Sequence, residues 1–305
     1  MDHPDNRKLH SQAVPLTGGI AVFFTILAGT FALGIEPYTS EVLIIACAVF
    51  ALGVFDDIRH INATVRLFIQ YGSGVALATY GGIAIHNVGN LLGAGSIPLL
   101  MLAVPLTALA AAGLCNAYNM IDGIDGLAAG TITLPLLALY LLAIEAGHPM
   151  ADTLLLMLIP LAVFLVFNLG PNNALLPKMF LGDGGSVTLG FLVTASLVYF
   201  SQGERALIQP VTALWLVTIP LMDMLCTMLR RLKRGKKLME ADRSHLHHTL
   251  MDMGLSSRQT LLAMLGWAII CALIGLGLEA SPAYVSLACY FVVFFAHCLF
   301  VSKAS

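Results

Sequence analysis

The chain alternates between long apolar runs and short polar segments. About ten of these runs are roughly 16–24 residues long, which is enough to cross a lipid bilayer with some tilt. We therefore predict an all-α protein, a polytopic transmembrane helical bundle that forms a single integral-membrane domain over residues 1–305. The predicted spans are residues 16–35, 41–55, 66–85, 98–115, 127–144, 153–169, 185–200, 206–229, 259–278 and 283–301.

The polar segments between these runs fall into two sets. One set contains the N-terminal segment, residues 56–65, 116–126, 170–184 and 230–258, and the C-terminal tail. All of the 15 Lys and Arg residues except Arg205 lie in this set or at a span end beside it. Because basic residues concentrate on the cytoplasmic side, we expect this set and both termini to lie in the cytoplasm. The four internal segments then form one cytoplasmic active face.

The composition excludes an ordinary soluble domain. Charged residues make up 10% of the chain and hydrophobic residues 58%, whereas a soluble domain carries about 25% charged residues. The net charge of −2 gives no indication of a nucleic-acid partner, and none is expected. No cleavable signal peptide is evident, because residues 1–10 are polar.

The cysteines lie in or beside apolar runs and form no C-x-x-C pair. We therefore expect them to be small core residues rather than disulfides or metal ligands. The six are Cys47, Cys115, Cys226, Cys271, Cys289 and Cys298.

One polar stretch between two predicted spans carries a carboxamide or carboxylate at every third position. These residues are Asn116, Asn119, Asp122 and Asp125. The glycines that follow the two aspartates favour a short turn over a continuous helix. No Lys or Arg lies within the stretch, so the oxygen-rich side chains indicate binding of a hard cation or work on phosphate. The alternative is a polar stripe inside the helical bundle.

Two further acidic motifs lie at span ends on the same face. Asp56 and Asp57 close the second span, where adjacent carboxylates repel each other and oppose the helix dipole unless a cation is near. Asp183 lies in a glycine-rich turn before the seventh span, where backbone N–H groups approach an anion and the carboxylate offers an oxygen to Mg²⁺. The alternatives are a solvated helix end and an ordinary turn.

A histidine motif follows the basic run 230–237, which we interpret as a membrane-surface anchor. Its imidazoles can donate N–H groups to phosphate or sugar oxygens, whereas a zinc site would require more ligands than this spacing provides. A solvated loop is the alternative. Asp223, within the eighth span, is expected to face the bundle, either in a structural hydrogen bond or in a direct role. The motif is Asp242-Arg243-x-His245-x-His247-His248.

Taken in this order, the motifs resemble those of the polyprenyl-phosphate N-acetylhexosamine-1-phosphate transferases (glycosyltransferase family 4, MraY/WecA-like), and most closely the WecA-like branch. The resemblance covers nearly the whole chain, beginning with Arg7-Lys8-x-His10 and Pro15-x-x-Gly18-Gly19. Two features depart from the family pattern. Members usually carry one further span before this first motif. A misassigned start and a truncated chain are the two alternatives that would account for the missing span. The acid that often follows the double Asp by three residues is His60 here.

The resemblance implies transfer of GlcNAc-1-phosphate from a UDP-sugar to undecaprenyl phosphate, with release of UMP. It places a multi-pass enzyme in the bacterial cytoplasmic (inner) membrane, with its active site facing the cytoplasm and a role in initiating a lipid-linked envelope glycan such as O-antigen. By similarity, Asp183 and Asn119 bind Mg²⁺, with Mn²⁺ as an alternative. Asp56 and Asp57 are the expected catalytic residues, as base or nucleophile. The expected substrate-binding residues are Asn116, Asp122, Asp125, Arg243, His245, His247 and His248.

Two alternatives remain open at this stage. The same chemistry can act on another donor, such as phospho-MurNAc-pentapeptide or another N-acetylated amino-deoxyhexose. A protein of another class, a cation-coupled transporter or a lipid flippase, would require ionisable groups at mid-depth in the membrane, and only Asp223 comes near that position. The polyprenol length and a homodimeric state also remain open.

Overall fold

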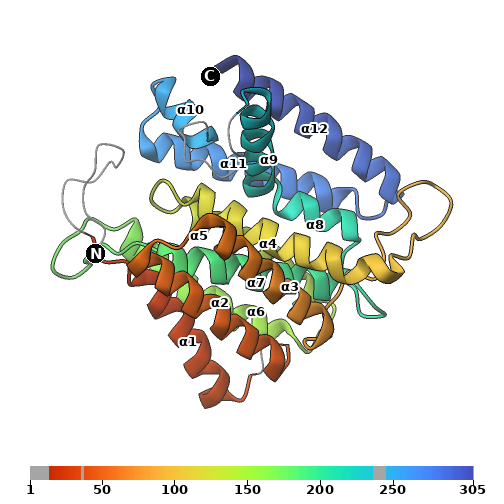
Figure 1. Cartoon of the computed structure of the whole chain (residues 1–305), viewed down its shortest axis with the longest axis horizontal. Helices are drawn as coiled ribbons and strands as arrows, with labels where there is room; N and C mark the ends of the chain where they lie inside the picture. Colours follow the sequence, from red (N-terminus) through yellow and green to blue (C-terminus); the bar gives the residue numbers. More distant parts are fainter. Residues whose placement is uncertain (1–13, 36–37, 236–244, 305) are drawn as a thin grey trace.

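The computed structural model describes residues 14–35, 38–235 and 245–304, and its regular elements within these ranges are all helices (Figure 1). The prediction of an all-α protein is confirmed, and each predicted span falls on a helix or a helix pair. The helices are α1 (Gly18–Leu33), α2 (Ser40–Arg59), α3 (Ala63–Thr79), the short 3-10 helix η1 (Leu100–Leu102), α4 (Ala103–Ile121), α5 (Leu127–Glu145), α6 (Ala151–Asn168), α7 (Gly182–Ser201), α8 (Pro210–Leu216), α9 (Thr218–Lys233), α10 (Leu246–Asp252), α11 (Ser257–Gly277) and α12 (Ala283–Ala304).

Within the described ranges, six helices are long and apolar enough to cross a membrane, and α8 with α9 makes a seventh if the bent pair is one span. The six helical ranges are Leu100–Ile121, Leu127–Glu145, Ala151–Asn168, Gly182–Ser201, Ser257–Gly277 and Ala283–Lys303. The chain is therefore a multi-pass membrane protein. The remaining apolar helix α1 is shorter, with 16 residues.

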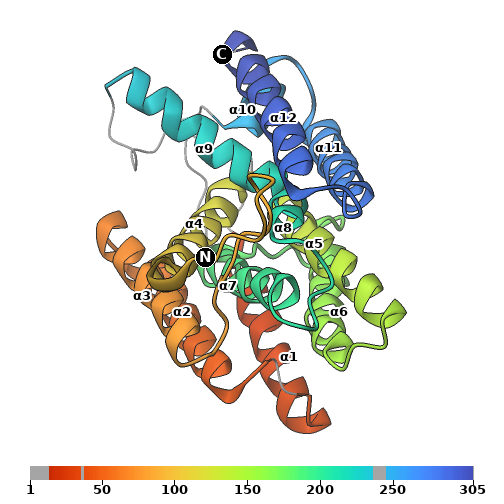
Figure 2. The same ribbon diagram turned by 90° about the vertical axis from the view of Figure 1, so that its right-hand side faces the viewer.

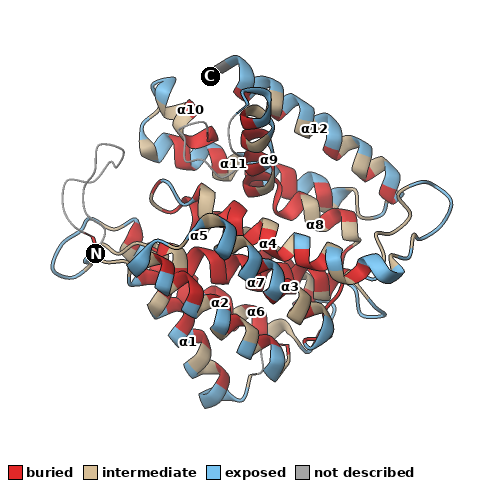
Figure 3. Ribbon diagram, viewed as in Figure 1, coloured by how far each residue is buried: buried red, intermediate tan, exposed pale blue. Residues whose placement is uncertain are grey.

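Helix α7 is the centre of the bundle. Its most apolar window is 94% buried, and helices α1, α2, α4 and α5 all pack on it (Figure 3). Two glycines let its neighbours approach closely, because a Cβ atom on Gly53 of α2 would lie 2.6 Å from the Asp183 carbonyl oxygen, and one on Gly190 of α7 would lie 3.0 Å from the Cys115 Cα. Small residues of this kind are typical of tightly packed helices in membranes.

The eighth predicted span is broken rather than continuous. Helix α8 ends at Leu216 and α9 begins at Thr218, with an 81° bend between them, so α9 projects from the bundle (Figure 2). Pro220 explains the break, because proline has no N–H to donate to the carbonyl four residues earlier and its ring clashes with that carbonyl. The span predicted over residues 206–229 therefore falls on a bent helix pair rather than on one straight helix.

The expectation that the cysteines form no disulfide is wrong for one pair. Cys226 of α9 and Cys298 of α12 are joined by a disulfide across a sequence separation of 72. Sequence spacing could not reveal this pair, because only the packing of α9 against α12 brings the two sulfur atoms together. The other four cysteines are free.

Candidate active site

The ends of three helices meet at one end of the bundle. Helix α2 ends just after Asp57, α4 ends just after Asn119, and α7 begins just before Asp183. Helix α4 continues through Ile121, so the expected turn is confined to residues 122–126, where Gly126 has a φ of 76°. The prediction that the whole stretch from Asn116 is a turn is therefore wrong for its first half. Each motif is carried on a helix end, which gives it a rigid support.

Asp57 caps the N-terminus of α7. Its Oδ1 accepts a hydrogen bond from the Asp183 backbone N–H at 2.9 Å, and its Oδ2 accepts one from Gly184 at 3.0 Å. The carboxylate that opposes the dipole of α2 is thus stabilised by the N–H groups and the dipole of another helix. Gly182, with a φ of 71°, is required here, since a Cβ would lie 2.9 Å from the Asp57 carboxylate.

Asp56, its neighbour, makes different contacts. It is buried, and its two oxygens accept hydrogen bonds from the Ile61 N–H and from Nη1 of Arg66, both at 2.7 Å. The same Nη1 lies 3.7 Å from Oδ2 of Asp183. Arg66 is therefore the nearby cation that the double Asp requires. In the sequence, Arg66 stands out only as a basic residue at a span end, although its position one turn into the next helix is a signal that could have marked it as this partner.

Asn119 and Asp183 are in direct contact. The Asn119 carboxamide donates to Oδ1 of Asp183 at 2.6 Å and to the Ser186 hydroxyl at 3.2 Å. Two residues, both expected to bind a metal, thus share one corner of the site although they lie 64 positions apart.

Asp122 lies in the turn after α4 and is exposed to solvent, although the nearby helix ends remove part of the hydration of its carboxyl. Loss of hydration raises the pKa of its carboxyl to about 7, with further contributions from the negative charges of Asp183, Asp125 and Asp57. Four carboxylates therefore gather in one region, and their mutual repulsion favours a bound cation.

Asp125 and Asn116 differ from their expected surroundings. Asp125 is paired with the Lys178 ammonium group, so the inference that no cation neutralises this stretch is wrong. Lys178 lies in the loop before α7. Because it is 53 residues from Asp125 in the sequence, the spacing of the motif did not indicate this ion pair. Asn116 is buried and donates to Oε1 of Gln70 at 2.6 Å and to the Ala112 carbonyl at 2.7 Å. Its predicted contact with substrate stays a prediction.

The histidine motif reaches the same region. His247 is buried, and its ring lies against the turn after α4, since a Cβ on Gly123 would lie 2.3 Å from His247 Nε2. The His248 ring lies 4.2 Å from that of His247 between centroids. His245 contacts Asp223 of α9 at 2.8 Å. Arg243 and Asp242 lie outside the described residues, as does the motif Arg7-Lys8-x-His10.

A small polar pocket of about 90 Å³ adjoins Asp125. It is lined by Lys178, by Gly170, and by Ser257 and Arg258 at the start of α11. Two cations beside an open carboxylate region are suited to a diphosphate or nucleotide.

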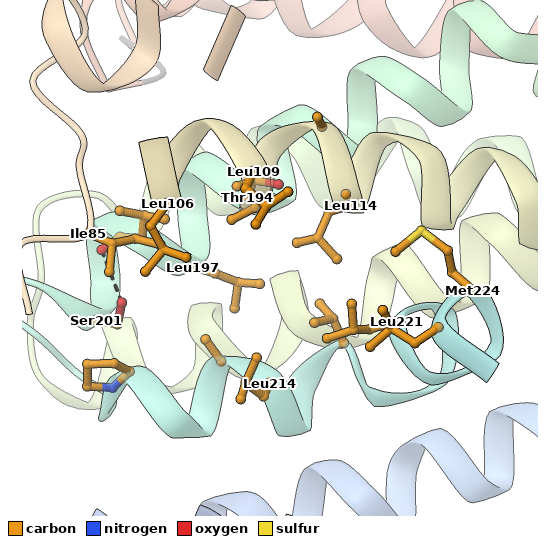
Figure 4. Close-up of a pocket in the computed structure, with 18 of the residues that line it drawn as sticks. Ile85, Leu106, Leu109, Leu114, Thr194, Leu197, Ser201, Leu214, Leu221 and Met224 are labelled. Atoms are coloured by element: carbon orange, nitrogen blue, oxygen red, sulfur yellow. Dashed lines mark hydrogen bonds between the residues drawn. The ribbon is translucent and has the colours of Figure 1, made fainter. Parts of the chain in front are cut away.

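A much larger apolar cavity of about 580 Å³ lies between α4 and the broken pair α8–α9, with α3 and α7 completing its walls (Figure 4). Its lining runs along α4 from Leu106 to Met120, a length of about 21 Å at 1.5 Å per residue. Asn116 and Met120 mark the end of the cavity that lies near the polar site. The shape and lining are those of a site for a long hydrocarbon chain.

The donor set fits a magnesium ion better than a transition metal. Among the described residues, no three His, Cys, Asp or Glu side chains cluster as a protein-only metal site. Mg²⁺ does not require one, because it is usually held by one or two carboxylates, retained waters and substrate phosphates. Asp183 with the Asn119 carboxamide, among carboxylates that repel each other, provides such a set.

Comparison with known proteins gives concordant matches. Residues 40–201 match glycosyl transferase family 4. The chain is 34% identical over 312 residues to the undecaprenyl-phosphate alpha-N-acetylglucosaminyl 1-phosphate transferase of Escherichia coli strain K12, covering 100% of this chain and 84% of that protein. It is 33% identical to the Yersinia pestis protein of the same name, with the same coverage. It is 30% identical to a Bacillus subtilis protein named probable undecaprenyl-phosphate N-acetylglucosaminyl 1-phosphate transferase, covering 96% and 81%.

Proposed function

The chain belongs to glycosyl transferase family 4, and we propose that it transfers GlcNAc-1-phosphate from UDP-GlcNAc to undecaprenyl phosphate with release of UMP. The relatives with this activity in their names match the whole chain. The polar site and the apolar cavity support the same reaction, since one substrate is a soluble nucleotide sugar and the other a lipid. The proposal rests on one observation: a site rich in carboxylates lies at the end of a cavity large enough for a hydrocarbon chain.

The topology proposed with this function has about ten spans, with both termini and the active face in the cytoplasm of a bacterial inner membrane. All described basic residues except Arg205 lie in segments assigned to that face or at its span ends, which supports the orientation. A nucleotide sugar made in the cytosol then reaches the site directly from water. The shared end of α2, α4 and α7 is where such a substrate would bind.

In the proposed reaction, an oxygen of the acceptor phosphate attacks the β-phosphorus of the nucleotide sugar. A new P–O bond forms there, the bond from the β-phosphorus to the bridging oxygen breaks, and UMP leaves with that electron pair. Asp183 and Asn119 are the residues that would hold Mg²⁺, which when bound would neutralise the charge on the diphosphate. Lys178 and Arg258 would hold the anionic donor beside Asp125.

We assign Asp56 and Asp57 an electrostatic and positioning role rather than that of a general base. A phosphate monoester has a second pKa of about 6, so the acceptor is mostly dianionic at neutral pH and holds little proton to remove. Both carboxylates are also engaged, Asp57 with two backbone N–H groups and Asp56 with Arg66. Asp57 would thus fix the start of α7, and Asp56 would hold Arg66, whose Nη1 lies 3.7 Å from Asp183.

The cavity is the proposed site for the first part of the polyprenyl chain. Its length of about 21 Å along α4 is shorter than a full undecaprenyl chain, so the remainder would extend into the bilayer. The apolar side chains of α8 and α9 form its outer wall, and Leu214, Leu221 and Met224 are seen around it in Figure 4.

The proposal is tested with purified protein in detergent, undecaprenyl phosphate, Mg²⁺ and a panel of UDP-sugars. We expect UMP release with UDP-GlcNAc and none after EDTA. UMP release with a different sugar donor would keep the chemistry and overturn the assigned substrate. Ion flux in proteoliposomes without UMP release from any donor would instead indicate a transporter.

A further inference from the structure

The start of α10 is held by a carboxylate from another helix. His245 is the N-cap residue of α10, but its side chain makes no capping hydrogen bond. Instead, Oδ1 of Asp223 accepts a hydrogen bond from the Leu246 N–H at 2.7 Å, and its Oδ2 lies 2.8 Å from His245 Nδ1. Asp223 is only 1% exposed. One buried carboxylate of α9 therefore fixes both the backbone and the ring at the beginning of the histidine motif.

This contact also determines which ring nitrogen of His245 carries the proton. A carboxylate only accepts hydrogen bonds, so Nδ1 must be protonated and Nε2 is left as the atom directed away from Asp223. The His245 ring is nearly parallel to that of His247, at 5.8 Å and 5°. His247 in turn lies against Gly123, in the turn that carries Asp122. Asp223 is thus connected to the polar site through two imidazole rings.

Asp223 also lies beside the cavity proposed for the acceptor. Leu221 and Met224, on the same helix, are part of the cavity wall (Figure 4). A buried carboxylate is costly at such a place unless its hydrogen bonds compensate. We propose that Asp223 is a positioning residue that holds His245 in the tautomer and orientation that bind the nucleotide-sugar donor, next to the wall of the acceptor cavity. This inference depends on the proposed function.

The test is a double-mutant cycle in detergent-purified full-length protein, with UDP-GlcNAc varied at saturating undecaprenyl phosphate. Asp223→Asn keeps the shape but presents an N–H to His245, which favours the opposite tautomer. We expect Asp223→Asn and His245→Ala each to lower kcat/KM for UDP-GlcNAc about tenfold or more, mainly through KM. The double variant should fall no more than about twofold below His245→Ala, because the two residues act as one unit.

Glu279 provides the matched control. It accepts hydrogen bonds from the Gln209 N–H at 2.6 Å and from the Thr212 hydroxyl, at the start of α8. Glu279→Gln therefore makes the same chemical change at the other end of the same broken span. We expect kcat/KM within about twofold of wild type, and an effect that multiplies with that of His245→Ala.

Two results would overturn the positioning role: kcat/KM of Asp223→Asn within twofold of wild type, or effects of Asp223→Asn and His245→Ala that multiply. If Asp223→Asn is unfolded at the assay temperature, Asp223→Ser, which removes the carboxylate from Nδ1, carries the same cycle and must again be non-multiplicative with His245→Ala. A wild-type protein that releases no UMP would overturn the proposed function itself. If the wild-type protein releases UMP but the effects of Asp223→Asn and His245→Ala multiply, only this inference is overturned.

Discussion

At the scale of single residues, neighbours in sequence make unrelated contacts. Asp56 pairs with Arg66, whereas Asp57 caps α7 through two backbone N–H groups. Successive residues near the end of a helix point about 100° apart, so adjacent carboxylates face different partners. The repulsion between them is therefore relieved by a cation for one and by a helix N-terminus for the other. This division explains how two adjacent acids persist at the end of an apolar span.

The ion pair of Asp56 gives a prediction. Asp56→Asn leaves the Arg66 guanidinium, a partly buried charge, without its 2.7 Å partner. We expect a loss of about 2 to 3 kcal/mol in stability, below the full cost of breaking a deeply buried pair because Arg66 keeps some contact with solvent. Adding Arg66→Gln should recover part of this loss in thermal denaturation, since no unpaired charge then remains. A double variant less stable than Asp56→Asn alone would contradict the pairing.

Activity should not recover in the same double variant. Arg66 also lies 3.7 Å from Asp183, so its removal takes a positive charge from the site itself. The rate of UMP release by the folded double variant, measured below its melting temperature, distinguishes this loss of activity from a loss of stability.

At the scale of helices, the site depends on how closely α2 and α7 approach. Gly53 and Gly184 lie at this crossing, and the backbone of α7 packs directly on α2. The contact places Asp57 within hydrogen-bonding distance of the first N–H groups of α7. A helix pair with larger residues at the crossing would hold the same acids too far from their partners.

Gly53→Ala tests this approach. The new Cβ would lie 2.6 Å from the Asp183 carbonyl oxygen and 2.7 Å from the Gly184 Cα, so α7 must shift. We expect destabilisation of about 1–3 kcal/mol, as for other overpacked sites, and at least about a tenfold loss of UMP release because Asp183 moves.

Gly72→Ala on α3 is the control, because a Cβ there meets nothing within 4 Å. It should leave activity unchanged and stability equal or slightly higher, given the better helix propensity of alanine. Equal behaviour of the two variants would show that the crossing has room to spare.

At the scale of the whole molecule, stability is linked to the charge gathered at one end of the bundle. The pKa of Asp122 is raised to about 7 in the folded protein, against about 3.9 in an unfolded chain. The folded state then binds more protons than the unfolded state between these two values. Stability must therefore fall as pH rises through this window, and the full loss is reached above pH 7.

The corresponding prediction concerns the metal-free protein. Its melting temperature, measured by intrinsic fluorescence in EDTA at constant ionic strength, should fall between pH 5 and pH 8. Millimolar Mg²⁺ should raise it most at pH 8, where the carboxylates are charged, and Asp122→Asn should reduce the dependence on pH. The same pH dependence in Asp122→Asn as in wild type would rule out Asp122 as its source.

The sequence by itself determined the helices and the set of polar motifs. Apolar runs long enough to cross a bilayer must form helices there, because no water satisfies their backbone groups, and this is a local property. Motif order likewise identified the family and placed the acids, amides and imidazoles at span ends. The break at Val217 was within reach of the sequence as well, since Pro220 is its cause.

Only the tertiary structure decided which of these side chains touch. The partners of Asp57, Asp125, His245 and Cys226 lie 126, 53, 22 and 72 positions away. No periodicity within a helix fixes such distances, because they depend on how helices cross and where each one ends. The same reason applies to Arg66 and Lys178. In the sequence they count only as positive charge on one side of the membrane, whereas in the structure they form ion pairs with Asp56 and Asp125.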